Sequence, residues 1–327
     1  MSWDFARELA RWGPASRGPS GPGCVRPSVT SDDIDVRTHP GPDGPRLAPA
    51  LAYCAHVARS HYENFTVVSA LLPRRLVRHF HAVYAYCRWS DDLADETAGG
   101  QVALDLLAWW RGELLTCYHG TPTHPVTVAL RETIRCFDIP PEPFLDLLSA
   151  FEQDQVVKRY DTFAQLRDYC RRSADPVGRL VLYLFGCFST ERAALSDEVC
   201  TGLQLANFWQ DVARDLAIGR VYLPAEDRKR FGYTDEDLEA TRFTPAFREL
   251  MRFEVERARG YFDRGAKLLP LLPREARVDV ELFIAGGRAI LRAVERQGYD
   301  VWARRPEVGK REKVQLLLGA AWRWWVS

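Results

Sequence analysis

Two groups of carboxylate side chains are spaced so that each shares one face of a helix. In the first, Asp91 and Asp95 stand four positions apart near the end of the segment Tyr84–Glu96, and Arg88 lies one turn before them. Residues three and four positions apart in a helix lie on the same face. Like charges at this spacing repel, and carboxylates at a helix C-terminus also oppose the helix dipole. A bound cation would reverse both penalties, so the pattern favours a cation site.

The second group lies about 120 residues further along the chain. Asn207, Asp211 and Asp215 form a stripe at every fourth position, with Gln204 one turn before it. Apolar side chains occupy the other side of this segment, where they can pack against a core. The sequence therefore predicts a second helix that turns a row of oxygen-bearing side chains to one side.

Together the stripes indicate chemistry on a diphosphate. Mg²⁺ prefers oxygen ligands and often binds through one or two carboxylates plus substrate phosphates. Two opposed carboxylate faces would hold ions that neutralise a diphosphate as it leaves, and Arg214 and Arg220 are close enough in sequence to meet a phosphate. A solvated helix face is the ordinary explanation of one such stripe. Two stripes in aromatic-rich helices favour a magnesium site beside a dry cavity suited to carbocations.

The elements that must position these residues are helical nearly throughout. From Leu47 onward apolar residues recur at helical spacing, and one helix is expected between Pro73 and Gly99, followed by another over 104–118. The segment 220–224 resembles a β-strand in composition, but it is too short to form a sheet. Further helices are predicted over 126–137, 141–159, 162–187, 196–217, 244–269 and 275–297. The fold class is therefore predicted to be all-α.

Composition excludes several other classes of protein. The chain has 327 residues, 46% of them hydrophobic, and a formal net charge of zero, which gives no sign of a nucleic-acid footprint. The eight cysteines include no CxxC pair, which disfavours a zinc ribbon, and reduced thiols are expected. Neither GxGxxG nor GxxxxGK[ST] occurs, so the sequence gives no support for a dinucleotide-binding or P-loop fold. Without a signal peptide or a bilayer-spanning apolar run, we expect a cytoplasmic protein, with membrane association left open.

Three regions are expected along the chain. Residues 1–45 are rich in proline and glycine, and we predict a disordered, dispensable extension there. Within it, Trp3–Trp12 is amphipathic, and an unstructured segment is favoured over a docking helix because short isolated helices are weak. Residues 46–315 form the predicted catalytic domain. Residues 316–327 form an aromatic tail after a basic stretch, which is either a peripheral membrane contact or a last core helix.

The chain resembles the squalene/phytoene synthase family at these two motifs and at several others over roughly residues 47–315. The matching segments are His61–Phe65 with Leu71–Arg75, Tyr169–Gly178, Gly219–Pro224, Gly298–Val301 and Arg304–Pro306. By this resemblance the fold is an isoprenoid synthase helical bundle with a central cavity. An isoprenoid diphosphate would be the substrate, with Mg²⁺ as cofactor and other squalene-pathway enzymes as partners.

The resemblance also implies a role for each site residue. Mg²⁺ would be held by Asp91, Asp95, Asn207, Asp211 and Asp215. The catalytic group would comprise Tyr84, Arg88, Tyr169 and Gln204. Substrate would be bound by Phe65, Arg88, Gln204, Asn207, Arg214, Arg220 and Tyr222. Ordinary core packing remains the alternative for Tyr84, Phe65 and Tyr169.

Two local variants narrow the resemblance. Gln210 stands where many family members have a basic residue, and the segment Ser173–Gly178 replaces a Val-Ala-rich version. Both variants resemble the bacterial hydroxysqualene synthases of the hopanoid pathway. That branch implies ionisation of presqualene diphosphate and capture of water, without NADPH. The alternatives are head-to-head condensation to presqualene diphosphate, squalene or phytoene, and a non-catalytic scaffold, which the intact aspartates disfavour.

Overall fold

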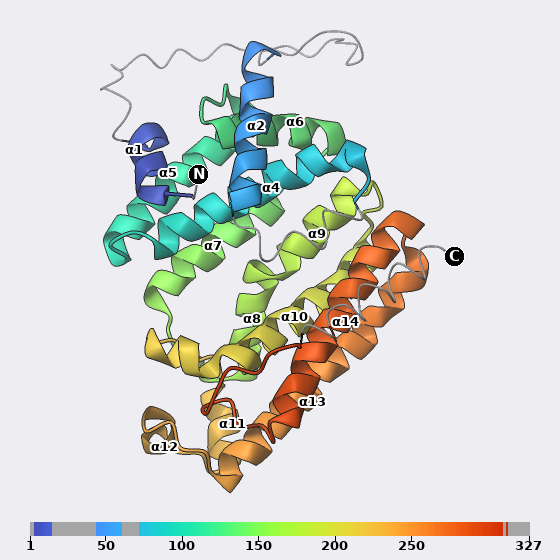
Figure 1. Cartoon of the computed structure of the whole chain (residues 1–327). Coiled ribbons are helices and arrows are strands. Elements are labelled where there is room, and N and C mark those ends of the chain that lie inside the picture. Colours follow the sequence, from blue (N-terminus) through green and yellow to red (C-terminus); the bar gives the residue numbers. More distant parts are fainter. Residues whose placement is uncertain (1–2, 15–43, 61–71, 310–311, 313–327) are drawn as a thin grey trace. The chain divides into compact units, whose positions relative to one another are not determined.

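The computed structural model describes residues 3–14, 44–60, 72–309 and 312 of the chain (Figure 1). Among these residues every regular element is a helix, which confirms the all-α prediction. The segment 220–224 contributes a single bridge, between Arg159 and Val221, and no strand is described. None of the described helices combines the length and apolarity needed to cross a membrane.

The described residues belong to two compact units. Unit 1 is drawn from Met1–Glu63 and Arg78–Cys136, and unit 2 from Asn64–Val77 and Phe137–Ser327. The helices of unit 1 are α1 (Phe5–Trp12), α2 (Gly44–Ser60), most of α4 (Arg74–Asp95), α5 (Gly100–His119) and α6 (Pro125–Phe137). Those of unit 2 are α7 (Glu142–Val156), α8 (Phe163–Ser173), α9 (Asp175–Leu184), α10 (Thr190–Ala217), α11 (Ala225–Arg230), α12 (Asp235–Glu239), α13 (Pro245–Gly265), the 3₁₀ helix η2 (Ala266–Leu271) and α14 (Arg274–Arg296).

An aromatic stack forms the core of unit 1 beneath the second half of α4. Trp89 of α4 and Trp110 of α5 are fully buried, with ring centroids 5.5 Å apart, and Tyr86 stacks on Trp110 at 5.7 Å. The Trp110 indole donates to the hydroxyl of Ser90 at 3.0 Å. Large rings with a satisfied polar atom pack rigidly, so this end of α4 is held firmly where it carries the first acidic stripe.

Helix α1 docks on this aromatic core. Asp4 caps the helix by accepting from the backbone N–H of Arg7 at 3.2 Å. Phe5 is buried against Trp89, with ring centroids 5.3 Å apart, and Trp12 packs edge-on against Tyr53 of α2.

The prediction of disorder over residues 1–45 is therefore wrong for residues 3–14, and the docking-helix alternative describes them. The proline and glycine residues on which that prediction rested lie downstream of α1, whereas Phe5 and Trp12 stand seven positions apart on one face of this helix. Those side chains gain enough burial on unit 1 to order a helix that would be marginal in isolation.

Replacing Phe5 with alanine is therefore expected to destabilise the protein by on the order of 2 kcal/mol, the scale of burying one large apolar side chain. The melting temperature should fall by several degrees in differential scanning calorimetry. Arg7→Ala changes an exposed position of the same helix and serves as the control. Equal melting temperatures for wild type and Phe5→Ala would show that α1 contributes nothing to the fold.

Helix α10 is the centre of unit 2. It packs against α9, α13 and α14, and Figure 1 shows it running beside the last two. Buried Leu205, Phe247 and Phe262 belong to the apolar core that these helices share. The helix begins at Thr190, earlier than the predicted residue 196, because the Ser189 hydroxyl caps it by accepting from the Arg192 N–H at 3.2 Å.

A proline divides the helix predicted over 162–187. The structure has α8 up to Ser173 and α9 from Asp175, with Pro176 in the first turn of α9. Proline cannot donate the helical hydrogen bond and its ring clashes with the preceding turn, so the helix ends before it. Gly178 of α9 approaches α10 closely, since a Cβ there would lie 2.3 Å from the Ser196 Oγ of α10.

Candidate active site

The first acidic stripe lies at the exposed end of α4 in unit 1. The Asp91 side chain is 41% exposed and its carboxylate lies 3.1 Å from the Arg88 guanidinium. Asp95 is exposed one turn further along. Tyr84 precedes Arg88 by one turn, and burial, opposed by Arg88, raises its pKa. The predicted residues Tyr84, Arg88 and Asp91 are thus neighbours, with two accessible carboxylates at the helix end.

Asp92 has a different environment from its neighbours on α4. It is fully buried, forms an ion pair with Arg88, and accepts a hydrogen bond from the Trp3 indole at 2.9 Å. Removing one partner of a buried pair leaves an uncompensated charge. Asp92 therefore positions Arg88 and α1, while the side chains of Asp91 and Asp95 are accessible to solvent.

The second stripe follows α10 in unit 2, and an arginine from the C-terminal segment covers part of it. Arg305 donates to both oxygens of Asp211, from Nε at 2.5 Å and from Nη2 at 2.9 Å. The Asp211 side chain is only 13% exposed. Arg214 is largely exposed, and its guanidinium lies 3.9 Å from Asp211. A metal ion at Asp211 would therefore compete with Arg305 for the carboxylate.

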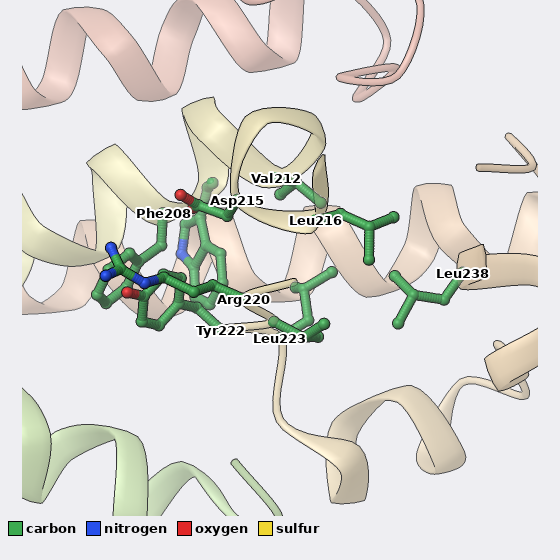
Figure 2. A pocket seen from close by; sticks show the side chains of 10 residues that line it. Phe208, Val212, Asp215, Leu216, Arg220, Tyr222, Leu223 and Leu238 are labelled. Atoms are coloured by element: carbon green, nitrogen blue, oxygen red, sulfur yellow. The ribbon is translucent and has the colours of Figure 1, made fainter. Parts of the chain in front are cut away.

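Asp215 is the least compensated carboxylate of the stripe. Its Oδ2 is buried and has no hydrogen-bond partner in the described part of the chain. Burial raises its pKa to about 7, assisted by the negative charge of Asp211 and opposed by Arg220 and Arg305. Figure 2 shows Asp215 and Arg220 at a cavity of about 10 Å³, about the size of one water molecule, lined otherwise by apolar and aromatic side chains.

Gln210 anchors the C-terminal segment. It is buried, its amide nitrogen donates to the Pro306 carbonyl at 2.6 Å, and its amide oxygen accepts from Arg305 at 2.9 Å. A basic side chain at this position would put two like charges side by side. The glutamine therefore suits the pairing of Arg305 with Asp211, which the sequence did not reveal.

An aromatic cluster lies beside the second stripe. Tyr222 stacks on Phe208 at 3.8 Å between centroids, and Tyr169 lies 6.0 Å from Tyr222. The Tyr169 hydroxyl donates to the carboxylate of buried Asp154 at 2.8 Å. Burial and the charge of Asp154 raise the pKa of Tyr169. Tyr169 is therefore a protonated donor fixed by Asp154.

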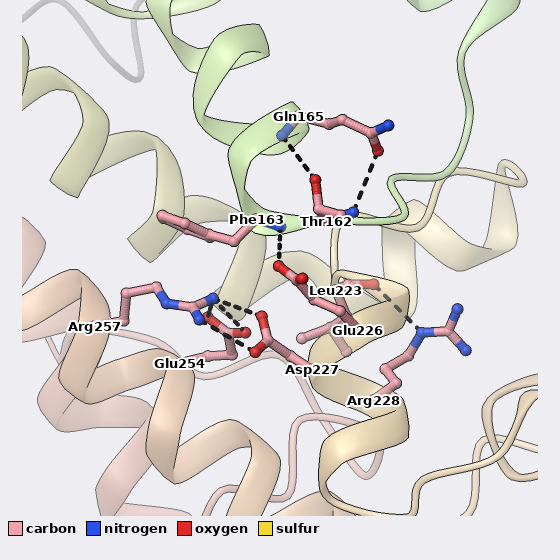
Figure 3. A network of polar contacts seen from close by, with 9 residues as sticks. All are labelled: Thr162, Phe163, Gln165, Leu223, Glu226, Asp227, Arg228, Glu254 and Arg257. Carbon is pink, nitrogen blue, oxygen red and sulfur yellow. Dashed lines mark hydrogen bonds and ion pairs between the residues drawn. The ribbon is translucent and has the colours of Figure 1, made fainter.

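The segment that carries Arg220 and Tyr222 is fixed by polar contacts on both sides. The Val221 N–H donates to the Lys158 carbonyl at 2.8 Å, which explains the single bridge. Figure 3 shows the contacts that follow it: Glu226 accepts from the Phe163 N–H at 2.6 Å, and Asp227 pairs with Arg257 at 2.7 Å. These contacts hold the turn after α10 close to Asp215.

The other predicted residues are less constrained. Asn207 is exposed at the start of the stripe, and Gln204 is half-buried. Phe65 and the tail 316–327 lie outside the described residues. In the described ranges no three His, Cys, Asp or Glu side chains gather into a metal cluster.

The residues nevertheless fit magnesium. Each stripe offers two carboxylates, which matches an ion that completes its shell with water and phosphate oxygens. The orphaned Oδ2 of Asp215 is a buried acceptor that a cation would satisfy.

Three functional neighbours escaped the sequence patterns: Trp3 on Asp92, Asp154 on Tyr169, and Arg305 on Asp211. Each contacts its partner across at least fifteen residues of chain, so helical spacing carries no trace of the pair. Only for Arg305 was there a hint, because the segment Arg304–Pro306 shares the family pattern.

Comparison with known proteins supplies the family. The family model for squalene/phytoene synthase matches residues 44–312. The phytoene synthase of Arthrospira platensis is 30% identical over 81% of this chain and 90% of its own length, and the 15-cis-phytoene synthase of Synechocystis is 31% identical over 84% of each.

Comparison with solved structures supports the same family. The squalene synthase HpnC of Alicyclobacillus acidocaldarius is 48% identical with a TM-score of 0.75, covering 77% of this chain and 95% of that one. A dehydrosqualene synthase in complex with ligand is 25% identical with a TM-score of 0.76, covering 86% of this chain and 99% of that one. The all-helical architecture is therefore that of an isoprenoid synthase, and the chain is an enzyme that belongs to the squalene/phytoene synthase family.

Proposed function

We propose that this enzyme ionises presqualene diphosphate and captures water to give hydroxysqualene. The observation that carries the proposal is the buried Ser173 hydroxyl, which has no hydrogen-bond partner in the described part of the chain. Ser173 lies one helical turn after Tyr169 on α8, so both side chains lie on the same face. A polar group of this kind beside aromatic rings can hold one water molecule in an otherwise dry site.

We propose that the residues of the two acidic stripes bind the Mg²⁺ on which the reaction depends. Asp91 and Asp95 would contribute from α4, and Asn207, Asp211 and Asp215 from α10. When bound, the ions supply positive charge that neutralises the departing diphosphate. Arg88, held by Asp92, would bind the diphosphate as a charged donor, assisted by Arg214 and Arg220.

The aromatic cluster would stabilise the cation that remains. Ring faces attract positive charge, and the clustered rings of Tyr169, Phe208 and Tyr222 exclude water from most of their surroundings. The Tyr169 proton stays in place because Asp154 accepts its hydrogen bond. Substrate contacts by Tyr84, Gln204 and Phe65 are part of the same proposal.

Ser173, Asp175 and Asn207 are polar candidates for holding the captured water, and their contacts favour Ser173. Asp175 is fully buried and already engaged, by Arg167 at 2.9 Å and by the Thr201 hydroxyl at 2.9 Å. Asn207 is exposed, where bulk water would compete. The buried Ser173 hydroxyl has neither a hydrogen bond nor an ion pair among the described residues, so Ser173 is the residue we assign to the captured water.

Incubation with Mg²⁺ and presqualene diphosphate in ¹⁸O-labelled water tests the reaction. The label is expected in the product hydroxyl, detected by mass spectrometry, and NADPH should have no effect. Product without the label would contradict water capture. Conversion of farnesyl diphosphate alone to presqualene diphosphate or squalene would instead favour the condensation alternative, which the phytoene synthase relatives support.

Ser173→Ala is expected to shift products from the alcohol toward hydrocarbons formed by proton loss, because the cation would then lack a placed water. The ratio of alcohol to hydrocarbon should fall about tenfold, the scale of losing one hydrogen bond. Ser149→Ala is the matched control, since the Ser149 hydroxyl is already used by the Leu145 carbonyl at 2.8 Å. An unchanged ratio in Ser173→Ala would exclude Ser173 as the holder of the water.

A further inference from the structure

A second cavity lies in unit 1, between α1, α2 and the start of α6. Its volume is about 430 Å³, within the usual range of small-molecule sites. Pro49 and Ala50 of α2 and Pro125 and Val128 of α6 give it an apolar wall. The acidic residues Asp91 and Asp95 are not among its lining residues.

Both charged side chains that line this cavity are positive. Arg11 and Arg46 line it, both side chains are exposed, and among the described residues that line it none is acidic. No ion pair is described for either guanidinium; Arg11 lies over the Trp12 ring, 4.9 Å from its centroid. The nearest acidic residue on α1, Glu8, is occupied by the Tyr53 hydroxyl at 2.9 Å. Two cations beside an apolar wall are complementary to an anion that carries an apolar chain.

Two aromatic side chains also line the cavity, and each has both an apolar ring and a polar atom. Trp12 and Tyr53 both line the cavity, and the Trp12 Nε1 is buried without a hydrogen-bond partner among the described residues. An indole N–H that is buried normally finds an acceptor. Tryptophan also favours the headgroup level of a bilayer, where its ring is covered and its N–H is satisfied.

We propose that this cavity binds the headgroup of an anionic phospholipid together with the beginning of its acyl chains. Arg11 and Arg46 pair with the phosphate, the Trp12 indole donates to a headgroup oxygen, and Pro49 and Val128 contact the chain. A lipid accounts for the apolar wall, which a free phosphate would leave exposed to water. None of the residues assigned to catalysis lines this cavity. An enzyme with a long, largely apolar product that is held at a membrane can release that product directly into the bilayer.

A ligand in the cavity would also stabilise the docking of α1, which lies beside the end of α4 that carries the first acidic stripe. The same helix presents Trp12 to the cavity, and Trp3, just before it, donates to Asp92 at 2.9 Å. A ligand that binds only the docked form of α1 stabilises that form by mass action. Lipid binding is therefore expected to raise the melting temperature of the full-length protein.

Calorimetric titration with dihexanoyl phosphatidylglycerol, below its micelle concentration, tests the site on the full chain. Binding is expected for this lipid, and at least tenfold weaker binding for dihexanoyl phosphatidylcholine and for inorganic phosphate. Arg11→Gln combined with Arg46→Gln should weaken binding at least tenfold, since both positive charges that pair with the phosphate are then lost. Trp12→Phe keeps the ring but removes the donor and should weaken binding severalfold.

The matched control replaces two exposed arginines elsewhere in unit 1, Arg59→Gln and Arg135→Gln, with the same loss of charge. All variants retain residues 316–327, so any membrane contact through that tail is equal among them. Equal binding of phosphatidylcholine or of phosphate would overturn the anionic-lipid assignment. Equal weakening in the control pair, or no binding of phosphatidylglycerol by folded wild type, would overturn the site itself.

Discussion

Asparagine in place of Asp95 is expected to reduce turnover about 100-fold or more while leaving the folded state intact. The substitution removes one charge from the proposed magnesium site, and losing one key electrostatic stabiliser has consequences of that size. Because Asp95 is exposed at the end of α4, its carboxylate does not support the core. The measurements are steady-state kinetics with varied Mg²⁺ and a melting curve.

Glu96→Gln is the matched control, because Glu96 is the adjacent exposed carboxylate and a helix turns it about 100° from the stripe. Its turnover should stay near that of wild type. EDTA should abolish wild-type turnover, and added Mg²⁺ should restore it. Mg²⁺ should also raise the melting temperature of Asp95→Asn by less than it raises that of the wild type. Similar losses in Asp95→Asn and Glu96→Gln would mean that general surface charge, rather than the stripe, supports activity.

The same experiment at the second stripe separates function from stability. Asp215→Asn should lose turnover on the scale of Asp95→Asn, yet the metal-free protein should not lose stability, because the buried Oδ2 has no partner to forfeit. Asp92→Asn should behave in the opposite way. It breaks a buried pair with Arg88 and is expected to lower the melting temperature.

Asp279→Asn is expected to stabilise the protein above neutral pH by up to about 4 kcal/mol, which corresponds to a pKa difference of about three units. Asp279 on α14 is 2% exposed, and neither carboxylate oxygen has a hydrogen-bond partner in the described residues. Burial raises its pKa to about 7. Because the unfolded chain ionises near pH 4 and the folded chain only near pH 7, the wild type loses stability as pH rises between these values.

Urea unfolding at several pH values measures this effect. The variant and the wild type should agree near pH 4, diverge up to about pH 7, and differ by a constant amount above it. Asp215 and Asp175, whose pKa values are also raised to about 7, remain in both proteins, so the difference isolates Asp279. Asp263→Asn, at an exposed ion pair with Arg288, should change little at any pH. A pH-independent difference for Asp279→Asn would show that this carboxyl titrates normally.

The fold class and the two acidic stripes could be predicted from the sequence because both depend on local spacing. A repeat of 3.6 residues per turn places Asp91 with Asp95, and Asp211 with Asp215, without knowledge of any other element. The same periodicity gave most helices to within a few residues. It failed at Pro176, where backbone chemistry overrides side-chain pattern, and at Ser189, whose capping hydroxyl extends α10 by nearly two turns.

Which carboxylates are buried, and which distant residues contact them, was decided by the tertiary structure alone. Asp92 and Asp91 are adjacent residues of one type, yet burial under α1 gives Asp92 two partners. Asp211 is engaged by Arg305 from 94 residues away, while Asp215, one turn further, keeps a buried oxygen without a partner. Burial and long-range pairing depend on how distant segments pack, and no local pattern encodes them. Sequence spacing therefore determined where the acidic faces lie, and packing determined the charge state and the partner of each carboxylate.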